Sequence, residues 1–282
     1  MKPIFDAQAA LGFVVSQTAH IETEVYQVRY PDIQYPGLVP VDTSAHPLAK
    51  TVTYYSAEKF GAAGWINGNA DDVPIAGSQR TKHDTAVHTA GIGYAYGWEE
   101  IQHAQMLGIN LTNDDAMAAR RAYEEMVDRV AILGDSTKGF EGLVNYTGVP
   151  VTPAGTGAWA SATAAQILKD VNDALTAIHV TQTNTVAMGD TVLLPWTKFN
   201  LIASKQLPDT QLTVLEFLRR NNVYTASTGN PLTIRGMREL DEAGVSGVAR
   251  MVTYRNSPQV LKLHIPMPHR FLPVYQAGPL RS

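Results

Sequence analysis

The sequence contains no cysteine in its 282 residues. This absence excludes disulfide scaffolds, zinc–thiolate sites, iron–sulfur clusters and thiol nucleophiles together. The sequence also lacks an apolar run of the roughly 18 residues that a membrane span needs, and it has no run of lysines or arginines. Because the net charge is −4 and the pI is near 6.0, tight binding of nucleic acid through its phosphates is not expected.

Catalytic motifs are missing as well. The sequence has no GxSxG nucleophile elbow, its GIGYAYG stretch lacks the GxGxxG spacing, and its GDSTKGFEG stretch is not in P-loop order. Two sets of residues contain metal-ligating types: His83, His88, Asp71, Asp72 and Asp84, and Glu100 with His103. The first set lacks HExxH and EF-hand spacing, and the second shows once a Glu-x-x-His pattern that carboxylate di-iron bundles use twice. We therefore expect no enzyme activity, catalytic residue, cofactor or metal, and a metal-dependent hydrolase using His83, Asp84 and His88 is kept as an alternative.

The most regular pattern is that of a long helix, expected over residues 113–133. Thr112 and Asn113 are N-cap types, and Gly134 follows the pattern as a C′ glycine does. One face carries an apolar stripe at three- and four-residue spacing, made of Tyr123, Met126, Val127, Val130 and Leu133. The other face carries opposite charges four residues apart, namely Arg120 with Glu124, Arg121 with Glu125, and Glu125 with Arg129. Such a helix would bury one side and offer a charged side to its neighbours.

A long two-armed excursion is expected earlier in the chain. Residues 51–60 (TVTYYSAEKF) and 85–96 (TAVHTAGIGYAY) are typical of strands. The stretch between them is rich in glycine, alanine, asparagine and aspartate and has no periodicity, and connections this long are usually functional. A two-stranded ribbon standing alone is marginal in water. We expect it to lie on something outside its own chain.

The remaining elements are shorter and give an α+β class. Residues 1–50 read as an arm, with a helix over 5–15, a strand-like stretch at 22–30, and extended backbone where Pro31, Pro36 and Pro40 recur. Further helices are expected at 98–107, 163–178 and 213–220, the last two with capping boxes that start at Thr163 and Thr213. Strands are expected at 191–194 and 232–234, and a hairpin at 249–254 and 260–265.

Several stretches carry a family resemblance through their order. The first two of these stretches are YPDIQYPGLVPVD and TVTYYSAEKFGAAGWI. They are followed by RRAYEEMVDRVAILGD and GFEGLVNYTGV, and near the end by RMVTYRNSPQVLKLHIPMPHRFLPV. Together they resemble tailed-bacteriophage major capsid proteins of the Hong Kong-phage-type (Johnson) fold, which encapsulins share. The resemblance implies an N-terminal arm at 1–50, an E-loop at 51–96, a P-domain with its spine helix at 97–139, an A-domain at 140–245, and a P-domain return hairpin with the C-terminal segment at 246–282.

The resemblance also implies a function. The chain would self-assemble into pentamers and hexamers and form the icosahedral head shell that encloses the phage genome. Its partners would be copies of itself, with scaffolding, portal and decoration proteins; it would enclose double-stranded DNA without sequence-specific binding and would contact no membrane. Its place would be the virion capsid, assembled in the cytoplasm of a bacterial host. An encapsulin-like nanocompartment shell is the alternative within the same fold.

A set of residues on the E-loop, the spine helix and the last segment is expected to form the assembly interface. These residues are Tyr54, Tyr55, Lys59, Phe60, Trp65, Arg80, Arg120, Arg121, Glu124, Glu125, Arg129 and Arg255.

Overall fold

The computed structural model describes residues 32–66, 68, 73–107, 111–208 and 210–272. Residues Ile33–Ser282 form one compact unit, and all elements below belong to it. The helix expected at 5–15 and the strand-like stretch at 22–30 lie outside the described residues. None of the helices in the described part is long and apolar enough to cross a membrane.

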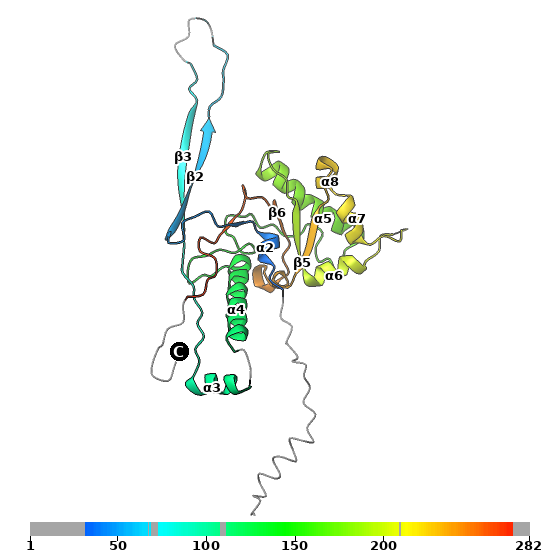
Figure 1. Ribbon diagram of the computed structural model, residues 1–282. Helices are drawn as coiled ribbons and strands as arrows, with labels where there is room; N and C mark the ends of the chain where they lie inside the picture. Colours follow the sequence, from blue (N-terminus) through cyan, green and yellow to red (C-terminus); the bar gives the residue numbers. More distant parts are fainter. Residues whose placement is uncertain (1–31, 67, 69–72, 108–110, 209, 273–282) are drawn as a thin grey trace, which may run out of the picture. The chain divides into compact units, whose positions relative to one another are not determined.

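A small mixed sheet forms the centre of the main core (Figure 1). Its middle strand β4 (Thr191–Pro195) is buried at every position. It pairs parallel with β5 (Thr233–Met237) and antiparallel with β6 (Val252–Tyr254). The apolar run at 191–194 predicted such a strand, because a strand covered on both faces shows no alternation.

Helices beside this sheet supply the rest of the core. They are α5 (Ala164–Thr176), α6 (Trp196–Ser204), α7 (Val214–Arg220) and α8 (Val223–Thr228). The capping box predicted at Thr163 is present, since Thr163 and Gln166 each accept from the other's backbone N–H. Ile167, Val171 and Leu175 of the predicted stripe are fully buried. The shorter turns are a π-helix (Ala177–Gln182) after α5 and two 3-10 turns, η2 (Arg238–Leu240) and η3 (Val245–Gly247).

The long helix α4 (Leu111–Leu133) confirms the predicted spine helix and begins two residues early. Thr112 and Asn113 therefore lie inside it, where they cannot be N-caps. Helix α3 (Trp98–Leu107) precedes it with the predicted bounds. Helix α4 ends at Leu133 and is followed by Gly134, whose φ of 73° is the left-handed conformation expected of a C′ residue.

The GLVN stretch at 142–145 completes the end of α4. The backbone N–H groups of Leu143 and Val144 donate to the carbonyl oxygens of Ala131 and Ile132, at 2.9 and 3.1 Å. The amide of Asn145 donates to the carbonyl of Leu133 at 2.8 Å. Carbonyls at a helix end have no partner within the helix, so this stretch satisfies three of them.

The segment before the ribbon differs from the extended arm that its prolines predicted. Pro36 lies in a helical turn, α2 (Tyr35–Leu38), and proline fits the first turn of a helix because its missing N–H is not needed there. The turn is held on α4 by Asp128, which accepts from the backbone N–H groups of Gln34 and Tyr35 at 2.8 and 2.7 Å. The phenol of Tyr35 also donates to Glu124 at 2.9 Å.

The predicted hairpin at 249–254 and 260–265 is wrong in its pairing. Its first arm becomes β6 and joins the main sheet, whereas β7 (Leu263–His264) pairs parallel with β1 (Val41–Asp42) near the start of the chain. Burial explains the change, because Tyr254 is 9% exposed and its hydroxyl donates to Leu38 at 2.8 Å. The last segment thus joins two regions of the fold instead of pairing with itself.

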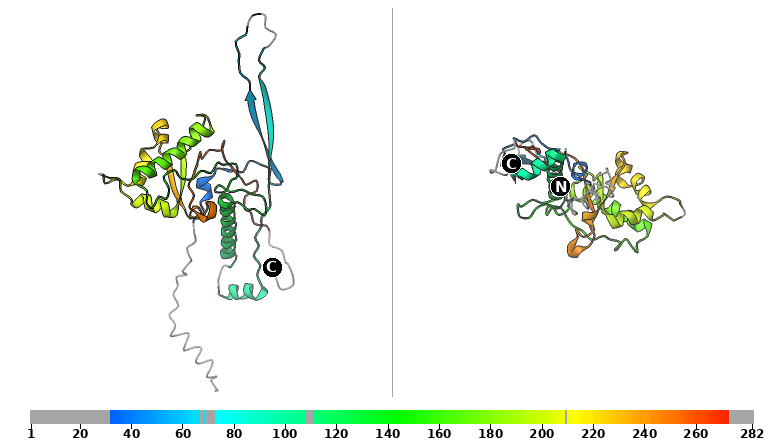
Figure 2. Two further views of the ribbon diagram at one scale, coloured as in Figure 1. Left: turned by 180° about the vertical axis from the view of Figure 1, so that it is seen from behind. Right: turned by 60° about the horizontal axis from the view of Figure 1, so that its bottom comes forward.

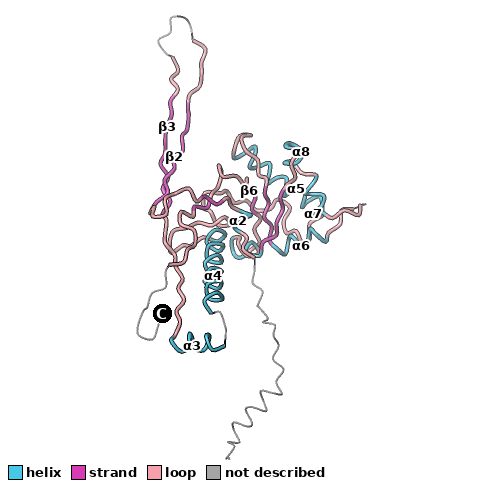
Figure 3. The backbone as a smooth tube through the Cα atoms, viewed as in Figure 1, coloured by secondary structure: helices cyan, strands magenta, loops and turns pink. Residues whose placement is uncertain are grey.

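The ribbon is made of β2 (Thr51–Phe60) and β3 (Gly77–Ala86), drawn as the long paired strands of Figure 3. The first strand has the predicted bounds. The second was predicted at 85–96; in the structure it begins eight residues earlier and ends ten residues earlier. The strand GSQRTKHDTA has no apolar alternation because both of its faces are exposed, so the pattern used to find strands is missing.

Candidate assembly interface

The ribbon has two chemically different faces, which its register defines. Strands β2 and β3 pair antiparallel from Thr51 opposite Ala86 to Phe60 opposite Gly77, and residues directly opposite share a face. Figures 1 and 2 show the strands side by side, and no other helix or strand of the described chain covers them. We call one side the aromatic face, made of Val52, Tyr54, Ser56, Glu58, Phe60, Gly77, Gln79, Thr81, His83 and Thr85. The other is the cationic face, made of Thr51, Thr53, Tyr55, Ala57, Lys59, Ser78, Arg80, Lys82, Asp84 and Ala86.

The aromatic face holds its side chains in fixed contacts. The rings of Tyr54 and His83 stack, with centroids 4.8 Å apart. A nitrogen of His83 also lies 2.9 Å from the hydroxyl of Ser56. Phe60 covers Gly77 so closely that a Cβ there would lie 2.6 Å from the ring. Tyr54 and Phe60 remain more than half exposed, at 54% and 59%.

The cationic face is exposed at every position. Lys82 forms an ion pair of 2.8 Å with Asp84, the only acidic residue on this face. Hydrogen bonds from Lys82 and then from Thr53 lower the pKa of Asp84, which stays ionised beside them. Lys59 and Arg80 have no acidic partner within the described residues. They give this face a surplus of positive charge.

The tip of the ribbon, between β2 and β3, carries several highly exposed large apolar side chains. Trp65, predicted as an interface residue, is fully exposed at 106%. Ile66, Val73 and Ile75 are exposed at 53%, 56% and 88% and are not among the predicted interface residues. The signal was present, because large apolar residues inside a glycine- and asparagine-rich loop have no core of their own to join.

The spine-helix residues of the predicted interface divide into two groups. Arg120 and Arg129 are exposed. Arg121 pairs with Glu125 at 2.7 Å, which confirms one of the predicted i,i+4 pairs. Glu124 instead accepts from Tyr35 of the same chain and is half-buried. Arg255 is exposed after β6, so the predicted residues lie on three separate elements and do not converge on one site.

The apolar stripe of α4 is less buried than its pattern predicted. Met126 and Leu133 are 39% and 41% exposed, and Val127 and Val130 are half-buried. The face that packs most closely carries Ala131 and Ile132 instead, at 8% and 2% exposure. The stripe, Leu133 excepted, lines an open groove of about 2760 Å³ together with the base of the ribbon and the segment before β7.

A row of contacts between aromatic rings joins the spine helix to the last described segment. Tyr123 of α4 lies 5.1 Å from His269, whose ring lies 4.7 Å from Phe271. Phe271 reaches Tyr94 at 6.2 Å, and Tyr94 reaches Tyr96 at 5.6 Å, all between ring centroids. The GIGYAYG and HIPMPHRF stretches therefore meet in one cluster, which accounts for aromatic residues that no catalytic motif explains.

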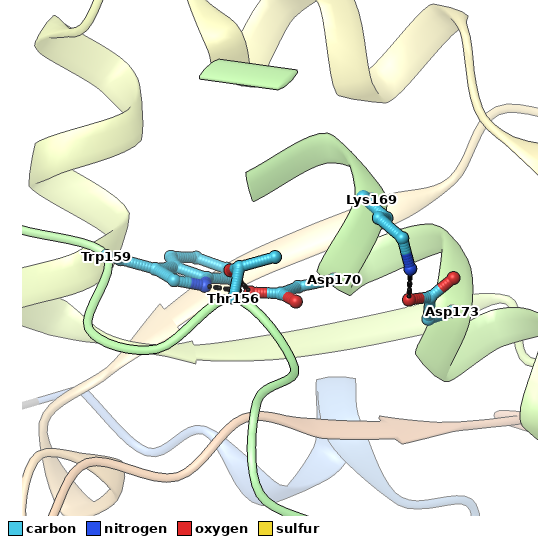
Figure 4. Close-up of polar contacts among 5 residues, drawn as sticks. All are labelled: Thr156, Trp159, Lys169, Asp170 and Asp173. Carbon is cyan, nitrogen blue, oxygen red and sulfur yellow. Dashed lines mark hydrogen bonds and ion pairs between the residues drawn. The ribbon is translucent and has the colours of Figure 1, made fainter. Parts of the chain in front are cut away.

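A buried carboxylate fastens the loop before α5. Asp170, 6% exposed, accepts hydrogen bonds from the hydroxyl of Thr156 and from the indole of Trp159, the latter at 2.8 Å (Figure 4). One turn further along the helix, Asp173 pairs with Lys169 in solvent (Figure 4). Asp170 is thus a structural anchor for the loop.

The residues considered as metal ligands do not form a site in the described chain. His83 and Asp84 lie on opposite faces of the ribbon, and His88 contacts Phe140 with ring centroids 5.4 Å apart. Asp71 and Asp72 lie outside the described residues. No group of three histidine, aspartate or glutamate residues that could hold a metal ion occurs in the described part.

Two comparisons with known proteins point to the same kind of protein, and a third finds no match. A family model described as "Major capsid protein" matches residues 61–282. A search of curated proteins finds no match. Among the solved structures that match is one entitled "The capsid of Myoviridae Phage XM1", with a TM-score of 0.77 and 19% sequence identity. The alignment covers 100% of this chain and 91% of that chain, so the two share a fold over most of their lengths.

Proposed function

The chain belongs to the major capsid protein family, and from that membership we propose that it is the head-shell subunit of a tailed phage. Proteins of this family build a capsid shell from copies of one chain, which places the chain in the virion. In the proposal, copies form pentamers and hexamers that close into an icosahedral shell around double-stranded DNA. Assembly takes place in the bacterial host cytoplasm, with scaffolding, portal and decoration proteins as further partners, and the subunit has no catalytic role.

The observation that carries the proposal is the unsupported ribbon. Beyond its base, which lines the groove with α4, the ribbon of β2 and β3 extends without another strand or helix of the described chain packed on either face. An isolated two-stranded ribbon is marginal in water, and exposed aromatic patches of this kind mark interaction sites. A neighbouring subunit would supply the missing surface, as the assignment of residues 51–96 to an E-loop requires.

The stability of such a shell would come from the number of contacts. When a ribbon of one copy lies on the next copy around a ring, the contact is heterologous, and rotation closes the ring into a capsomer. Each contact can be weak, because a closed shell makes many of them at once. The acidic net charge of −4 also suits a shell wall that encloses DNA without binding it tightly.

The test is to express the full chain and to examine it by size-exclusion chromatography and negative-stain electron microscopy, alone and with a candidate scaffolding protein. We expect rings or closed shells several times larger than the chain. A particle of 30.6 kDa under every salt condition, with and without the scaffold, would contradict the proposal.

A further inference from the structure

We infer that the ribbon is one-sided in the shell: its aromatic face lies on the body of a second copy of this chain, and its cationic face stays in solvent. This inference rests on the proposed function and adds which face of the ribbon makes the contact. The two faces differ enough in chemistry for the choice to be made from their residues.

Apolar area favours the aromatic face. Val52, Tyr54 and Phe60 lie on it, and the tyrosine and phenylalanine are 54% and 59% exposed in the isolated chain, whereas the cationic face has one large ring, Tyr55. Removal of apolar surface from water stabilises a contact by about 25 cal/mol for each Å². Aromatic side chains are also the ones enriched at interface centres.

The aromatic face is also pre-organised. Tyr54 is stacked on His83, and His83 is bonded to Ser56, so these rings hold their positions before any partner arrives. Binding then loses little side-chain entropy, which is one of the main costs of association.

Burial would cost more on the cationic face, which carries Lys59, Arg80, Lys82 and Asp84, whereas Glu58 is the one acidic or basic residue of the aromatic face besides His83. Burial of Lys59 and Arg80 would require an acidic partner for each, because an unpaired buried charge is strongly unfavourable. The one acid on this face, Asp84, is already paired with Lys82. Both side chains are long and flexible and would lose rotamer freedom. In solvent they instead protect the free strand edges of the ribbon from indiscriminate pairing.

Continuity with the tip identifies a second copy as the occupant. Phe60 is the last residue of β2, and the tip with exposed Trp65 and Ile75 lies between β2 and β3. Exposed apolar side chains thus continue from the aromatic face into the tip of the ribbon. In a shell made of copies of one chain, the surface available to every such ribbon is the body of the next copy.

The absence of cysteine makes the test direct. Tyr54 and Tyr55 are neighbours on opposite faces, with exposures of 54% and 66%, so Tyr54→Cys and Tyr55→Cys form a matched pair. Each variant is labelled with a maleimide before and after assembly. We expect similar rates in unassembled chains, and in shells a rate at least about tenfold lower for Tyr54→Cys only. Equal rates in shells, or protection of Tyr55→Cys instead, would overturn the inference.

A second pair of variants keeps the test decisive if a cysteine variant fails to assemble. We expect Tyr54→Glu to lower the assembled fraction about tenfold, because a buried carboxylate lacks a partner, and Tyr55→Glu to assemble as the unmodified chain does. If both variants assemble normally, or if only Tyr55→Glu fails, the inference is wrong. A failure of the unmodified chain to form shells would instead contradict the proposed function.

Discussion

The side chain of Asn145 donates a hydrogen bond of 2.8 Å to the carbonyl oxygen of Leu133, the last residue of the spine helix. The oxygen of the same side-chain amide, Oδ1, accepts from the backbone N–H of Gly142 at 2.7 Å. One amide therefore fastens both the helix end and the turn that returns from it.

Replacement of Asn145 by alanine removes both bonds. We expect Asn145→Ala to lower the free energy of unfolding by about 1–2 kcal/mol, measured by urea denaturation of unassembled chains. Asn200→Ala, at an exposed position of α6, is the control and should change it by less than about 0.5 kcal/mol. Equal effects would mean that the helix end is satisfied without Asn145.

The contact between Gly134 and Gly142 leaves no room for a side chain. A Cβ on Gly142 would lie 2.3 Å from the carbonyl oxygen of Ile132 and 2.4 Å from the nitrogen of Gly134. Because backbone atoms cannot move aside cheaply, Gly142→Ala should destabilise the chain by about 3 kcal/mol or more. Gly91→Ala, with nothing within 4 Å of the added Cβ, should have a near-wild-type melting temperature in the same thermal scan.

The buried carboxylate of Asp170 offers a matched comparison with its neighbour Asp173. Asp170→Asn weakens the bonds from Thr156 and Trp159, and we expect a loss of about 1–3 kcal/mol. Asp173→Asn breaks an exposed ion pair and should cost less than about 1 kcal/mol. Chemical denaturation followed by tryptophan fluorescence would measure both. An equal loss in the two variants would argue against the role of Asp170 as an anchor.

Alkaline pH should weaken the attachment of Tyr35 to the spine helix. Burial, and then the hydrogen bond to Glu124, raise the pKa of Tyr35 to about 12, from an ordinary value near 10. Between these two values the unfolded chain loses the phenol proton and the folded chain keeps it, so stability falls as pH rises. Unfolding measured from pH 9 to 11.5 should show a weaker pH dependence in Tyr35→Phe than in the unmodified chain. The same dependence in both would exclude Tyr35 as its source.

The sequence alone was sufficient for the elements with strong local signals. The spine helix has a stripe, charge pairs and a terminal glycine, and α5 has a capping box, so both are confirmed in the structure. Strand β4 was found because its apolar run is continuous. In each case the residues that decide the structure lie within one stretch of chain.

Pairing between distant segments could not be predicted in the same way. Strand β3 has no apolar alternation because both of its faces are exposed. Strand β6 pairs with β4 from a distant part of the chain, and its Tyr254 also bonds Leu38, which is 216 residues away. The faces of the ribbon residues proposed for assembly could not be predicted from the sequence either. Tyr54 and Tyr55 look alike in the sequence, and only the register of the ribbon separates them.

The tip of the ribbon should matter for assembly and not for folding. The side chain of Trp65 is fully exposed and buries no surface within the chain. Trp65→Ala should therefore leave the melting temperature of unassembled chains unchanged. In the proposed shell the same change removes an interface anchor, and the concentration needed for assembly should rise by about tenfold, as expected for the loss of a contact worth 1–2 kcal/mol. Light scattering against protein concentration measures it, and an unchanged threshold would place the tip outside the interface.

Cryo-electron microscopy of particles formed by the full chain would decide whether the ribbon is an intersubunit element. A map in which β2 and β3 of each copy cross the body of the next copy, with Tyr54 and Phe60 covered and Lys59 and Arg80 in solvent, is the predicted result. A shell in which the ribbon contacts no other copy, or particles that never exceed a single chain, would contradict it.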